Sequence, residues 1–456
     1  MNPVLHAAPA AADAPFAELR AHEFGRLDQA GLAYLDYVGS GLYGASQVAA
    51  HQALLAHSVL GNPHSESGPS LASTKWLNAI HARVLQFLEA DPAEYTVIFA
   101  ANATAAIKLV AEGFPFTRGS HYALAADNHN SVNGVREYAA RAGARVSYLP
   151  LGDELRLAEP EPGLPQATSG APSLFAYPAQ SNFSGVRHPL ALIKHAAARG
   201  YEVLLDAAAF LPTAPLSLAT HRPAFVPVSF YKLFGYPTGV GALVARRDAL
   251  ARLRRPWFSG GTVDFVSVTH GIHQLRAGAE GYEDGTPNFL DVAALGAGFD
   301  LLERVGMPRI SGHVARLGSM LLDGLVRLTH RDGSPLVTLY GPRAFRDRGA
   351  TIAFNVLDRQ GRAVPFAPVI ERARQRNVAV RAGCFCNPGA SEAAFGWPAD
   401  RSRTCYDAGR DAFTIDGFGE CLGPDVAVGA VRASLGIASN AEDVRRAIEV
   451  IASFAE

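Results

Sequence analysis

Short apolar runs alternate with helix-length segments over the middle of the chain, from about Thr96 to Ala245. Seven runs rich in β-branched and aromatic residues lie there: TVIFA, HYALAA, RVSYLP, SLFAYPA, EVLLDA, FVPVSF and GALVA. This alternation predicts an α/β fold with a seven-stranded, mostly parallel sheet covered by helices on both faces. Ligands of such sheets bind at the carboxyl ends of the strands, so the residues that follow these runs are the first candidates for a site.

The pattern changes after residue 289. Apolar positions at helical spacing run through 289–330 and predict helices that lead into a smaller α+β domain. There TIAFNVL and VAVRAGCF are expected to be strands, and a last helix begins near Ala441. The stretch 395–425, rich in Gly, Asp and aromatic residues, is expected to be the least regular. We divide the chain into three parts, namely a disordered tail at 1–15, a large domain at 16–300 and a small C-terminal domain at 301–456.

Composition excludes several classes of partner. The 456 residues carry a formal net charge of −1, which gives no global attraction to nucleic acid or to an anionic membrane. No apolar run approaches the roughly 20 residues that span a bilayer. The opening HAAPAAADAP lacks a basic start and does not resemble a secretion signal. Four cysteines in so long a chain do not form a disulfide framework, and we expect a cytoplasmic protein.

Lys232 is the most informative single residue. It lies in VSFYKLFGYPTGVGALVAR (228–246), where an apolar strand delivers the lysine to a strand end and a glycine-rich turn follows. The chain has only four lysines among its 41 Lys and Arg residues. A lysine amine held partly desolvated on a rigid turn suits covalent attachment of pyridoxal phosphate and later proton transfer at one carbon. The alternative is an ordinary solvated surface lysine.

Several polar residues follow the other strands in the same way. Thr104, in FAANATAAIKLV, begins a helix that offers free N–H groups to a phosphate. Asp206 ends the run LLD, where its carboxylate could hold a pyridine nitrogen protonated. His129 begins a helix, where its ring could stack on a flat cofactor. Asn182 follows another strand. Each residue taken alone also fits an ordinary cap or turn. Their common order on successive strand ends favours a cofactor site.

A second group of candidates lies in RAGCFCNPGA (381–390). The Asn-Pro-Gly turn should expose Cys386, as a reactive thiolate requires. A metal site is the alternative, but tetrahedral zinc needs four ligands and Cys405 and Cys421 lack paired spacing, so we expect none. Inert buried cysteines are the other alternative. Arg432, in AVRASLG, could clamp a substrate carboxylate or be a surface arginine.

Longer motifs resemble one family over about residues 34–440. They are YLDYVGSGLYGASQV, GNPHSESGPS, DNHNSVNGVREYA, QSNFSGVR, LLDAAAF, YKLFGYPTGVGAL, FSGGTVDFVS, YEDGTPNFL, RAGCFCNPGA and GAVRASLG. The chain is similar to the class V aminotransferase-fold cysteine desulfurases, and most of all to the desulfurase domain of molybdenum cofactor sulfurases. The resemblance implies a fold-type I pyridoxal-phosphate enzyme.

The resemblance also implies a role for each candidate residue. Lys232 would bond covalently to pyridoxal phosphate, with Asp206 on the ring nitrogen, His129 over the ring and Asn182 near the ring oxygen. Ala103, Thr104 and Ser229 would hold the phosphate, and Gly261 and Thr262 would reach it from the second subunit of a homodimer. Cys386 would be the persulfide-forming thiol, and Arg432 would clamp the substrate carboxylate. The chain departs from many desulfurases at Tyr231, where they have His, and at Ala209, where they have Gln or His.

The expected activity is desulfuration of L-cysteine, with a persulfide on Cys386, release of alanine and transfer of sulfur to a protein or cofactor, the molybdenum cofactor being one candidate. One alternative is a pyridoxal-phosphate-dependent C–S lyase or epimerase on the same fold. Another is a sulfur-relay scaffold without turnover. If the segment around the two cysteines is extended, Cys384 shares a face with Cys386, and a relay through Cys384 stays open.

Overall fold

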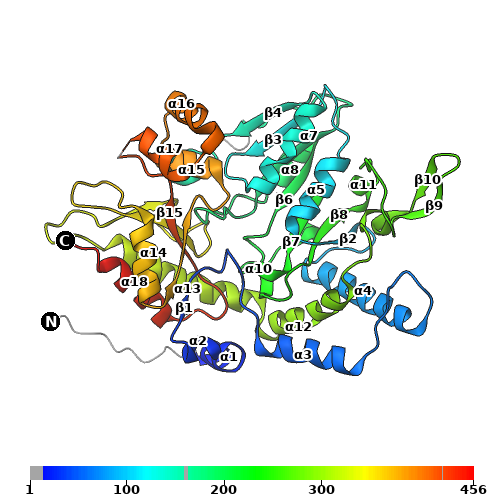
Figure 1. Ribbon diagram of the computed structural model, residues 1–456, viewed down its shortest axis with the longest axis horizontal. Helices are drawn as coiled ribbons and strands as arrows, with labels where there is room; N and C mark the ends of the chain where they lie inside the picture. The colour runs from blue at the N-terminus through cyan, green and yellow to red at the C-terminus, as the bar shows by residue number, and fades with distance from the viewer. Residues whose placement is uncertain (1–13, 159–162, 424) are drawn as a thin grey trace.

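The computed structural model describes residues 14–158, 163–423 and 425–456 (Figure 1). Residues 1–13, most of the expected tail, lie outside the described residues, and helix α1 (Ala14–Phe24) follows them directly. No helix in the described part of the chain has the length and apolarity needed to cross a membrane.

The centre of the molecule is the seven-stranded sheet expected from the sequence, with strand order β2-β8-β7-β6-β5-β3-β4 (Figure 1). Its strands are β2 (Tyr95–Ala100), β3 (His121–Ala125), β4 (Arg145–Leu149), β5 (Ser173–Pro178), β6 (Tyr201–Asp206), β7 (Phe225–Ser229) and β8 (Gly241–Arg246). Strand β8 runs antiparallel to both of its neighbours, and the other pairs are parallel. The mostly parallel α/β sheet is therefore confirmed.

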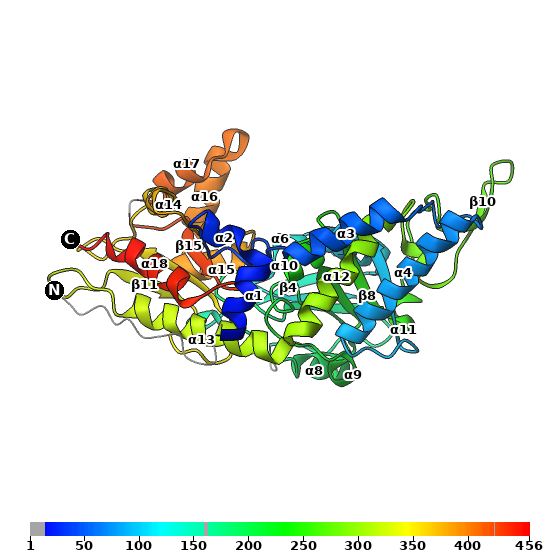
Figure 2. The same cartoon turned by 90° about the horizontal axis from the view of Figure 1, so that it is seen from below.

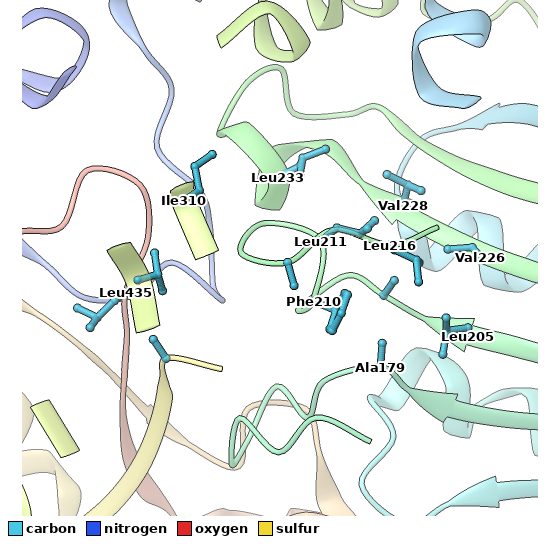
Figure 3. Close-up of a cluster of buried hydrophobic side chains, with 14 of the residues drawn as sticks. Ala179, Leu205, Phe210, Leu211, Leu216, Val226, Val228, Leu233, Ile310 and Leu435 are labelled. Carbon is cyan, nitrogen blue, oxygen red and sulfur yellow. The ribbon is translucent and has the colours of Figure 1, made fainter. Parts of the chain in front are cut away.

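Side chains from the two faces of this sheet enter two separate cores. In β6, Val203 and Leu205 join the larger core, whereas Leu204 between them joins the smaller one. Because both faces are covered, the strands are apolar at consecutive positions, which made them visible in the sequence. Figure 3 shows part of the larger core, where Leu205, Val226 and Val228 meet the segment around Phe210.

Helices cover both faces of the sheet. The smaller core is closed by α5 (Ala103–Gly113) and α7 (Val135–Arg141). The larger core takes side chains from α4 (Gly68–Phe87), α8 (Leu192–Ala198) and α12 (Phe289–Val305), and α3 (Ala45–His57) packs on α12. The short elements around them are α2 (Arg26–Gln29), α6 (Asn130–Asn133), η1 (Asp153–Leu155), α9 (Leu218–His221), α10 (Phe230–Phe234), α11 (Arg247–Leu250), η2 (Gly278–Tyr282) and the hairpin β9 (Val263–Ser267) and β10 (Ile272–Leu275).

The C-terminal part is built on a second, antiparallel sheet of order β11-β12-β15-β14, as the α+β prediction required. Its strands are β11 (Val337–Tyr340), β12 (Thr351–Val356), β14 (Arg381–Gly383) and β15 (Ala430–Ser434), packed with α13 (Met307–Val326), α14 (Phe366–Gln375) and α18 (Ala441–Ala452). Strand β1 (Ala33–Tyr34) pairs with β13 (Val378–Ala379), so this early segment lies against the C-terminal part. The division at residue 300 stays a prediction.

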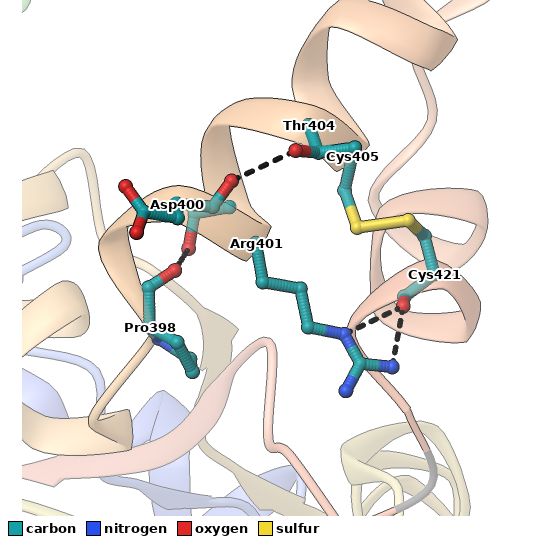
Figure 4. The surroundings of a disulfide bond; sticks show 7 residues. Pro398, Asp400, Arg401, Thr404, Cys405 and Cys421 are labelled. Atoms are coloured by element: carbon teal, nitrogen blue, oxygen red, sulfur yellow. Dashed lines mark hydrogen bonds between the residues drawn. A yellow bond between two sulfur atoms is a disulfide. The ribbon is translucent and has the colours of Figure 1, made fainter.

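One sequence-based expectation is wrong. The stretch 395–425 is not irregular, because α15 (Pro388–Phe395), α16 (Ala399–Gly409), η3 (Arg410–Ala412) and α17 (Ile415–Leu422) occupy most of its described residues. The Thr414 hydroxyl caps α17 by accepting the backbone N–H of Gly417, and Phe418 and Leu422 are buried against Cys405. Cys405 and Cys421 form a disulfide, although their spacing gave no sign of it (Figure 4). The disulfide links α16 to α17 beside this small core.

Candidate active site

A cavity of about 270 Å³ opens at the carboxyl end of the central sheet. The residues around it follow β2, β3, β5, β6 and β7 or lie on the helices after them, as expected for this fold. Seven of the residues proposed from the sequence line it together: Ala103, Thr104, His129, Asn182, Asp206, Ser229 and Lys232. The remaining wall is made by Asn102, Ile107, Ser131, Pro178, Gln180, Ala208, Ala209 and Tyr231.

Lys232 enters the cavity from α10, the short helix that directly follows β7. Gly235 ends this helix at φ 83°, and a Cβ there would lie 2.2 Å from the backbone of Leu42 and Tyr43, so only glycine fits. The lysine keeps some exposed surface where it lines the cavity, yet its amine is surrounded by protein. This desolvation lowers the pKa of Lys232, and the carboxylate of Asp206 partly opposes the shift.

Asp206 and His129 lie on the same cavity. Asp206 ends β6, and its Oδ1 accepts the backbone N–H of Ala208 at 3.0 Å. His129 caps α6, where its Nδ1 accepts the backbone N–H of Ser131 at 3.1 Å. Burial lowers the pKa of His129 despite the opposing charge of Asp206, so the imidazole is neutral at neutral pH. A neutral, oriented ring suits stacking on a flat cofactor.

One end of the cavity is suited to a phosphate group. The eleven-residue helix α5 begins there, with the Oδ1 of Asn102 accepting the backbone N–H of Ala105 at 2.9 Å. The Thr104 and Ser131 hydroxyls are 2.8 Å apart. The Ser229 hydroxyl is buried without a hydrogen-bond partner. A buried hydroxyl without a partner, beside a helix N-terminus, fits an anionic ligand that would satisfy it.

The cysteine loop, residues 384–387, lies beside the cavity without lining it. Phe385 and Cys386 both have left-handed backbone, with φ 54° and 55°. The segment is therefore not extended, and the two thiols have different surroundings. Cys386 is exposed, whereas Cys384 is half-buried with its thiol donating to the Val428 carbonyl at 3.3 Å. Burial raises the pKa of Cys384 and favours its protonated thiol.

Three side-chain and backbone contacts tie the cysteine loop to the cavity wall. The amide of Asn182 donates to the Phe385 carbonyl at 2.7 Å, and its Oδ1 accepts from Asn387 Nδ2 at 2.8 Å. The backbone N–H of Asn130, next to His129, donates to the Cys386 carbonyl at 2.8 Å. Asn182 is thus both a wall of the cavity and an anchor of the cysteine loop.

Arg432 is not the surface arginine of the alternative interpretation, since only 2% of it is exposed. Its Nη1 donates to the Asn182 carbonyl at 2.8 Å, its Nη2 lies 3.1 Å from Asp36 Oδ1, and its guanidinium lies over the Phe385 ring. Burial lowers the pKa of Arg432 to about 10, against the opposing effect of Asp36. The side chain therefore carries its charge at neutral pH beside the cavity and the cysteine loop.

Gly261 and Thr262 do not reach the cavity within one chain. They precede the hairpin formed by β9 and β10, and the Thr262 hydroxyl donates to the Ser259 carbonyl at 2.8 Å. The hairpin projects away from the C-terminal part, with Phe265, Val268 and Ile272 exposed on it (Figure 2). A role for Gly261 and Thr262 in the site of a second subunit stays a prediction.

The sequence did not single out Ser131, Gln180 or Asp36 as site residues, and it marked Tyr231 only as a departure from many desulfurases. Gln180 is buried at the end of β5, where its Nε2 donates to the Ala209 carbonyl at 3.0 Å. The place of Gln180 after a strand was an available signal, as for Asn182. Asp36 lies in the motif YLDYVGSGLYGASQV, but nothing in that motif indicated its contact with Arg432. Among the described residues, no three His, Cys, Asp or Glu side chains gather where they could hold a metal ion.

Comparison with known proteins assigns a family. Residues 33–447 match the aminotransferase class-V domain. The chain belongs to the aminotransferase class-V family. Membership confirms the expected enzyme class and its cofactor, pyridoxal phosphate, which the lysine, the aspartate and the phosphate-suited end of the cavity fit.

Curated relatives of this class-V chain include molybdenum cofactor sulfurases. The Bos taurus protein is 39% identical over 462 residues, covering 95% of the chain and 51% of the relative. The Arabidopsis thaliana protein is 34% identical, covering 96% of the chain and 58% of the relative. The chain thus spans little more than half the length of these relatives.

Solved structures share the fold at lower identity. A cysteine desulfurase from Thermococcus onnurineus NA1 has a TM-score of 0.79 at 23% identity, covering 96% of this chain and 98% of its own. The cysteine desulfurase CsdA from Escherichia coli has a TM-score of 0.75 at 22% identity, with coverages of 96% and 97%. The cystine C–S lyase C-DES has a TM-score of 0.72 at 17% identity, with coverages of 95% and 100%. These likenesses confirm the predicted fold class.

Proposed function

We propose that the chain is a pyridoxal-phosphate-dependent L-cysteine desulfurase that forms a persulfide on Cys386 and releases alanine. The observation that carries the proposal is the double contact of Asn182. This residue lines the cavity of Lys232 and Asp206, and its amide holds the backbone beside Cys386 at 2.7 Å. A thiol anchored at the wall of a cofactor cavity suits attack on a sulfur atom of the bound substrate.

Bound pyridoxal phosphate supplies an aldehyde carbon for the amines of Lys232 and the substrate, and a ring that withdraws electrons from the substrate carbons. Burial lowers the pKa of Lys232 and so favours its unprotonated amine, the form that can remove and return protons at the substrate carbons. With the cofactor bound, the Asp206 carboxylate would hold the ring nitrogen protonated. His129, whose pKa is lowered by burial, would pack over the ring face without adding charge.

Cys386 carries the sulfur step. Its thiolate attacks the sulfur of the substrate cysteine, the carbon–sulfur bond breaks, and the electron pair stays with the substrate carbon. That carbon takes up a proton, so cysteine and one enzyme thiol become alanine and one enzyme persulfide without an external oxidant or reductant. Exposure of Cys386 then leaves the outer sulfur open to an acceptor.

Arg432 and the second subunit complete the proposal. The guanidinium of Arg432 binds the substrate carboxylate, and Gly261 and Thr262 of a second copy approach the phosphate in a homodimer. The acceptor is a protein or a cofactor, and the similarity to molybdenum cofactor sulfurases supports the molybdenum cofactor as the first candidate. The cytoplasmic location expected from the sequence stays a prediction, and the disulfide between Cys405 and Cys421 is unusual for a reducing compartment.

One alternative is a C–S lyase, supported by the fold shared with C-DES. A lyase does not need Cys386, whereas a scaffold without turnover releases no product at all. The deciding experiment measures alanine and Cys386 persulfide after incubation of the purified holoenzyme with L-cysteine. Stoichiometric alanine with a Cys386 persulfide supports the desulfurase. Pyruvate in place of alanine, or no product, refutes it.

A further inference from the structure

Two arginines lie directly opposite each other on neighbouring strands of the C-terminal sheet. Arg381 of β14 is the register partner of Arg432 of β15. Like charges at directly opposite positions of an antiparallel pair repel each other. The side chains also differ in exposure, with 49% of the Arg381 side chain exposed and only 3% of the Arg432 side chain. The pair needs a counter-charge, and the buried member needs it most.

Asp36 supplies that charge from a distant part of the sequence. Its carboxylate lies 3.1 Å from Arg432 Nη2 and 2.7 Å from Arg381 Nη2. The backbone of Asp36 bridges to Ser434, two residues after Arg432. Gly39 leaves room for the group, since a Cβ at this position would lie 2.4 Å from Asp36 Oδ2 and 2.6 Å from Arg381 Nη2. Residues from three distant parts of the sequence therefore meet at the Asp36 carboxylate.

The contacts of Arg432 show what Asp36 contributes. Arg432 Nη1 donates a hydrogen bond to the Asn182 carbonyl, and Nη2 donates one to the Asp36 carboxylate. The Phe385 ring covers one face of the guanidinium. Two acceptors on different nitrogens fix the rotation of a planar guanidinium. Without Asp36, one acceptor and one ring face would remain. The buried Nε has no hydrogen-bond partner, so the group is not saturated by the protein.

We propose that Asp36 is a positioning residue that holds the Arg432 guanidinium in the orientation that binds the substrate carboxylate. The inference rests on the carboxylate-clamp role of Arg432 in the proposed function. Asp36 does not contact the substrate, and it acts only through Arg432. Arg381 is the exposed partner that balances the remaining charge of Asp36, and exposed pairs of this kind contribute little.

The test compares two ligands that differ only in a carboxylate, L-alanine and ethylamine. Each is titrated into the holoenzyme while the cofactor absorbance is followed. Asp36→Asn keeps the shape but removes the charge, and charge-assisted hydrogen bonds are about twice as strong as neutral ones. We expect L-alanine binding to weaken about tenfold while ethylamine binding stays unchanged, because ethylamine has no group for Arg432. Equal weakening of both ligands, or tighter binding of L-alanine, would overturn the proposal.

A double-mutant cycle separates a positioning role from a direct one. In an Arg432→Gln background, Asp36→Asn should cause no further loss of L-alanine binding, and an additional loss would mean that Asp36 acts independently of Arg432. If Asp36→Asn does not retain cofactor, Asp36→Glu is measured in the same way. The longer side chain keeps the charge but misplaces it, so only L-alanine binding should fall, and an equal loss for ethylamine overturns the proposal.

Asp443 provides a matched control. It forms a buried ion pair with Arg20 at 2.6 Å, outside the cavity. Asp443→Asn should lower the melting temperature without changing the ratio of L-alanine to ethylamine affinity. A wild-type protein that binds L-alanine but releases none from L-cysteine would refute the desulfurase proposal and leave the role of Asp36 standing.

Discussion

Asn182 holds the backbone of Phe385, with 2.7 Å between its Nδ2 and the carbonyl oxygen. The two residues are separated by 203 positions in the sequence, and one of them lines the cavity while the other precedes Cys386. Because Phe385 and Cys386 have left-handed backbone, the loop depends on such outside contacts to keep its shape.

Substitution of Asn182 by Ala should therefore slow persulfide formation more than it disturbs cofactor binding. The change leaves the Phe385 carbonyl without its partner, which costs about 1–3 kcal/mol for a buried group. It also removes one of the two acceptors of the Asn387 amide, which keeps its hydrogen bond to the Asp127 carbonyl. We expect the single-turnover rate of persulfide formation to fall at least tenfold. Asn355→Ala is the control, because its amide also donates to a buried carbonyl, that of Gly429, outside the cavity. Equal rates in the two variants would contradict the coupling of cavity wall and loop.

Lys232→Ala should abolish covalent attachment of the cofactor. Lys232 is the one lysine among the residues that line the cavity. Borohydride treatment followed by peptide mapping should find cofactor on Lys232 in the wild type and on no lysine in the variant. Lys194 is exposed on α8 and offers the control, since Lys194→Ala should bind cofactor as the wild type does. Cofactor fixed to another residue of the Lys232→Ala variant would refute the assignment.

Arg432→Ala should chiefly weaken the binding of L-cysteine while pyridoxal phosphate stays in place. A hydrogen bond between charged groups contributes roughly 1.5–3 kcal/mol, which predicts a rise in KM of roughly 10- to 150-fold. The variant also leaves Asp36 without its buried partner, so thermal unfolding must be measured alongside KM. An unchanged KM in a folded variant would remove Arg432 from the substrate site.

Protonation of His121 should lower the free energy of unfolding in acid. Burial lowers the pKa of His121 to about 4, and its ring nitrogens lie 2.6 Å from the Tyr201 hydroxyl and 2.7 Å from that of Ser147. In the unfolded chain the pKa is about 6.5, so as the pH falls the unfolded state binds a proton first and gains stability. The free energy of unfolding should drop by about 2 kcal/mol between pH 7.5 and pH 5 because of this one group.

Urea titrations at pH 7.5 and pH 5 measure that contribution. His121→Gln should be less stable than the wild type at pH 7.5 but should lose less stability on acidification. His57, exposed at the end of α3, is the control, and His57→Gln should keep the full acid sensitivity of the wild type. The same acid loss in His121→Gln and in the wild type would exclude His121 as its source.

The sequence predicted those parts of the molecule that neighbouring residues in the chain are enough to indicate. The run EVLLDA became β6, Tyr201–Asp206, because Val203, Leu204 and Leu205 are buried on alternating faces and are therefore apolar at consecutive positions. Five cavity residues, Thr104, His129, Asn182, Asp206 and Lys232, were predicted for a related reason, since each follows a strand or begins a helix at one edge of the sheet. Ala103 and Ser229 were expected only from the resemblance to the desulfurases. Neither prediction needed long-range contacts.

The parts that escaped prediction depend on distant partners. Asp36 meets Arg432 across 396 positions, and nothing near Asp36 in the sequence announces the contact. Helix α17 was missed because its apolar residues Ile415, Phe418 and Leu422 stand among glycine and acidic residues that indicate a loop. Its stability comes from the Thr414 cap and from the disulfide between Cys405 and Cys421, and neither follows from a periodic pattern.

The choice between the two free cysteines is the last prediction. Cys386→Ser should bind cofactor and L-cysteine but form no persulfide, whereas Cys384→Ser should keep most of the activity. The structure favours this assignment because Cys386 is exposed, while the Cys384 thiol donates to Val428 and is held protonated by burial. The left-handed backbone at Phe385 and Cys386 also removes the extended geometry on which a shared face depended.

Peptide mapping after a single turnover with sulfur-labelled L-cysteine decides the point. The label should be on Cys386 in the wild type and in Cys384→Ser, and it should be absent from Cys386→Ser. Cys384→Ser also serves as the matched control, because it removes a thiol two residues away and leaves the anchors of the loop at Asn182 and Asn387 in place. Label on Cys384 alone in the wild type would reverse the assignment. Label that passes from Cys386 to Cys384 over time would instead establish a relay, because the first sulfur would still have been taken by the exposed thiol.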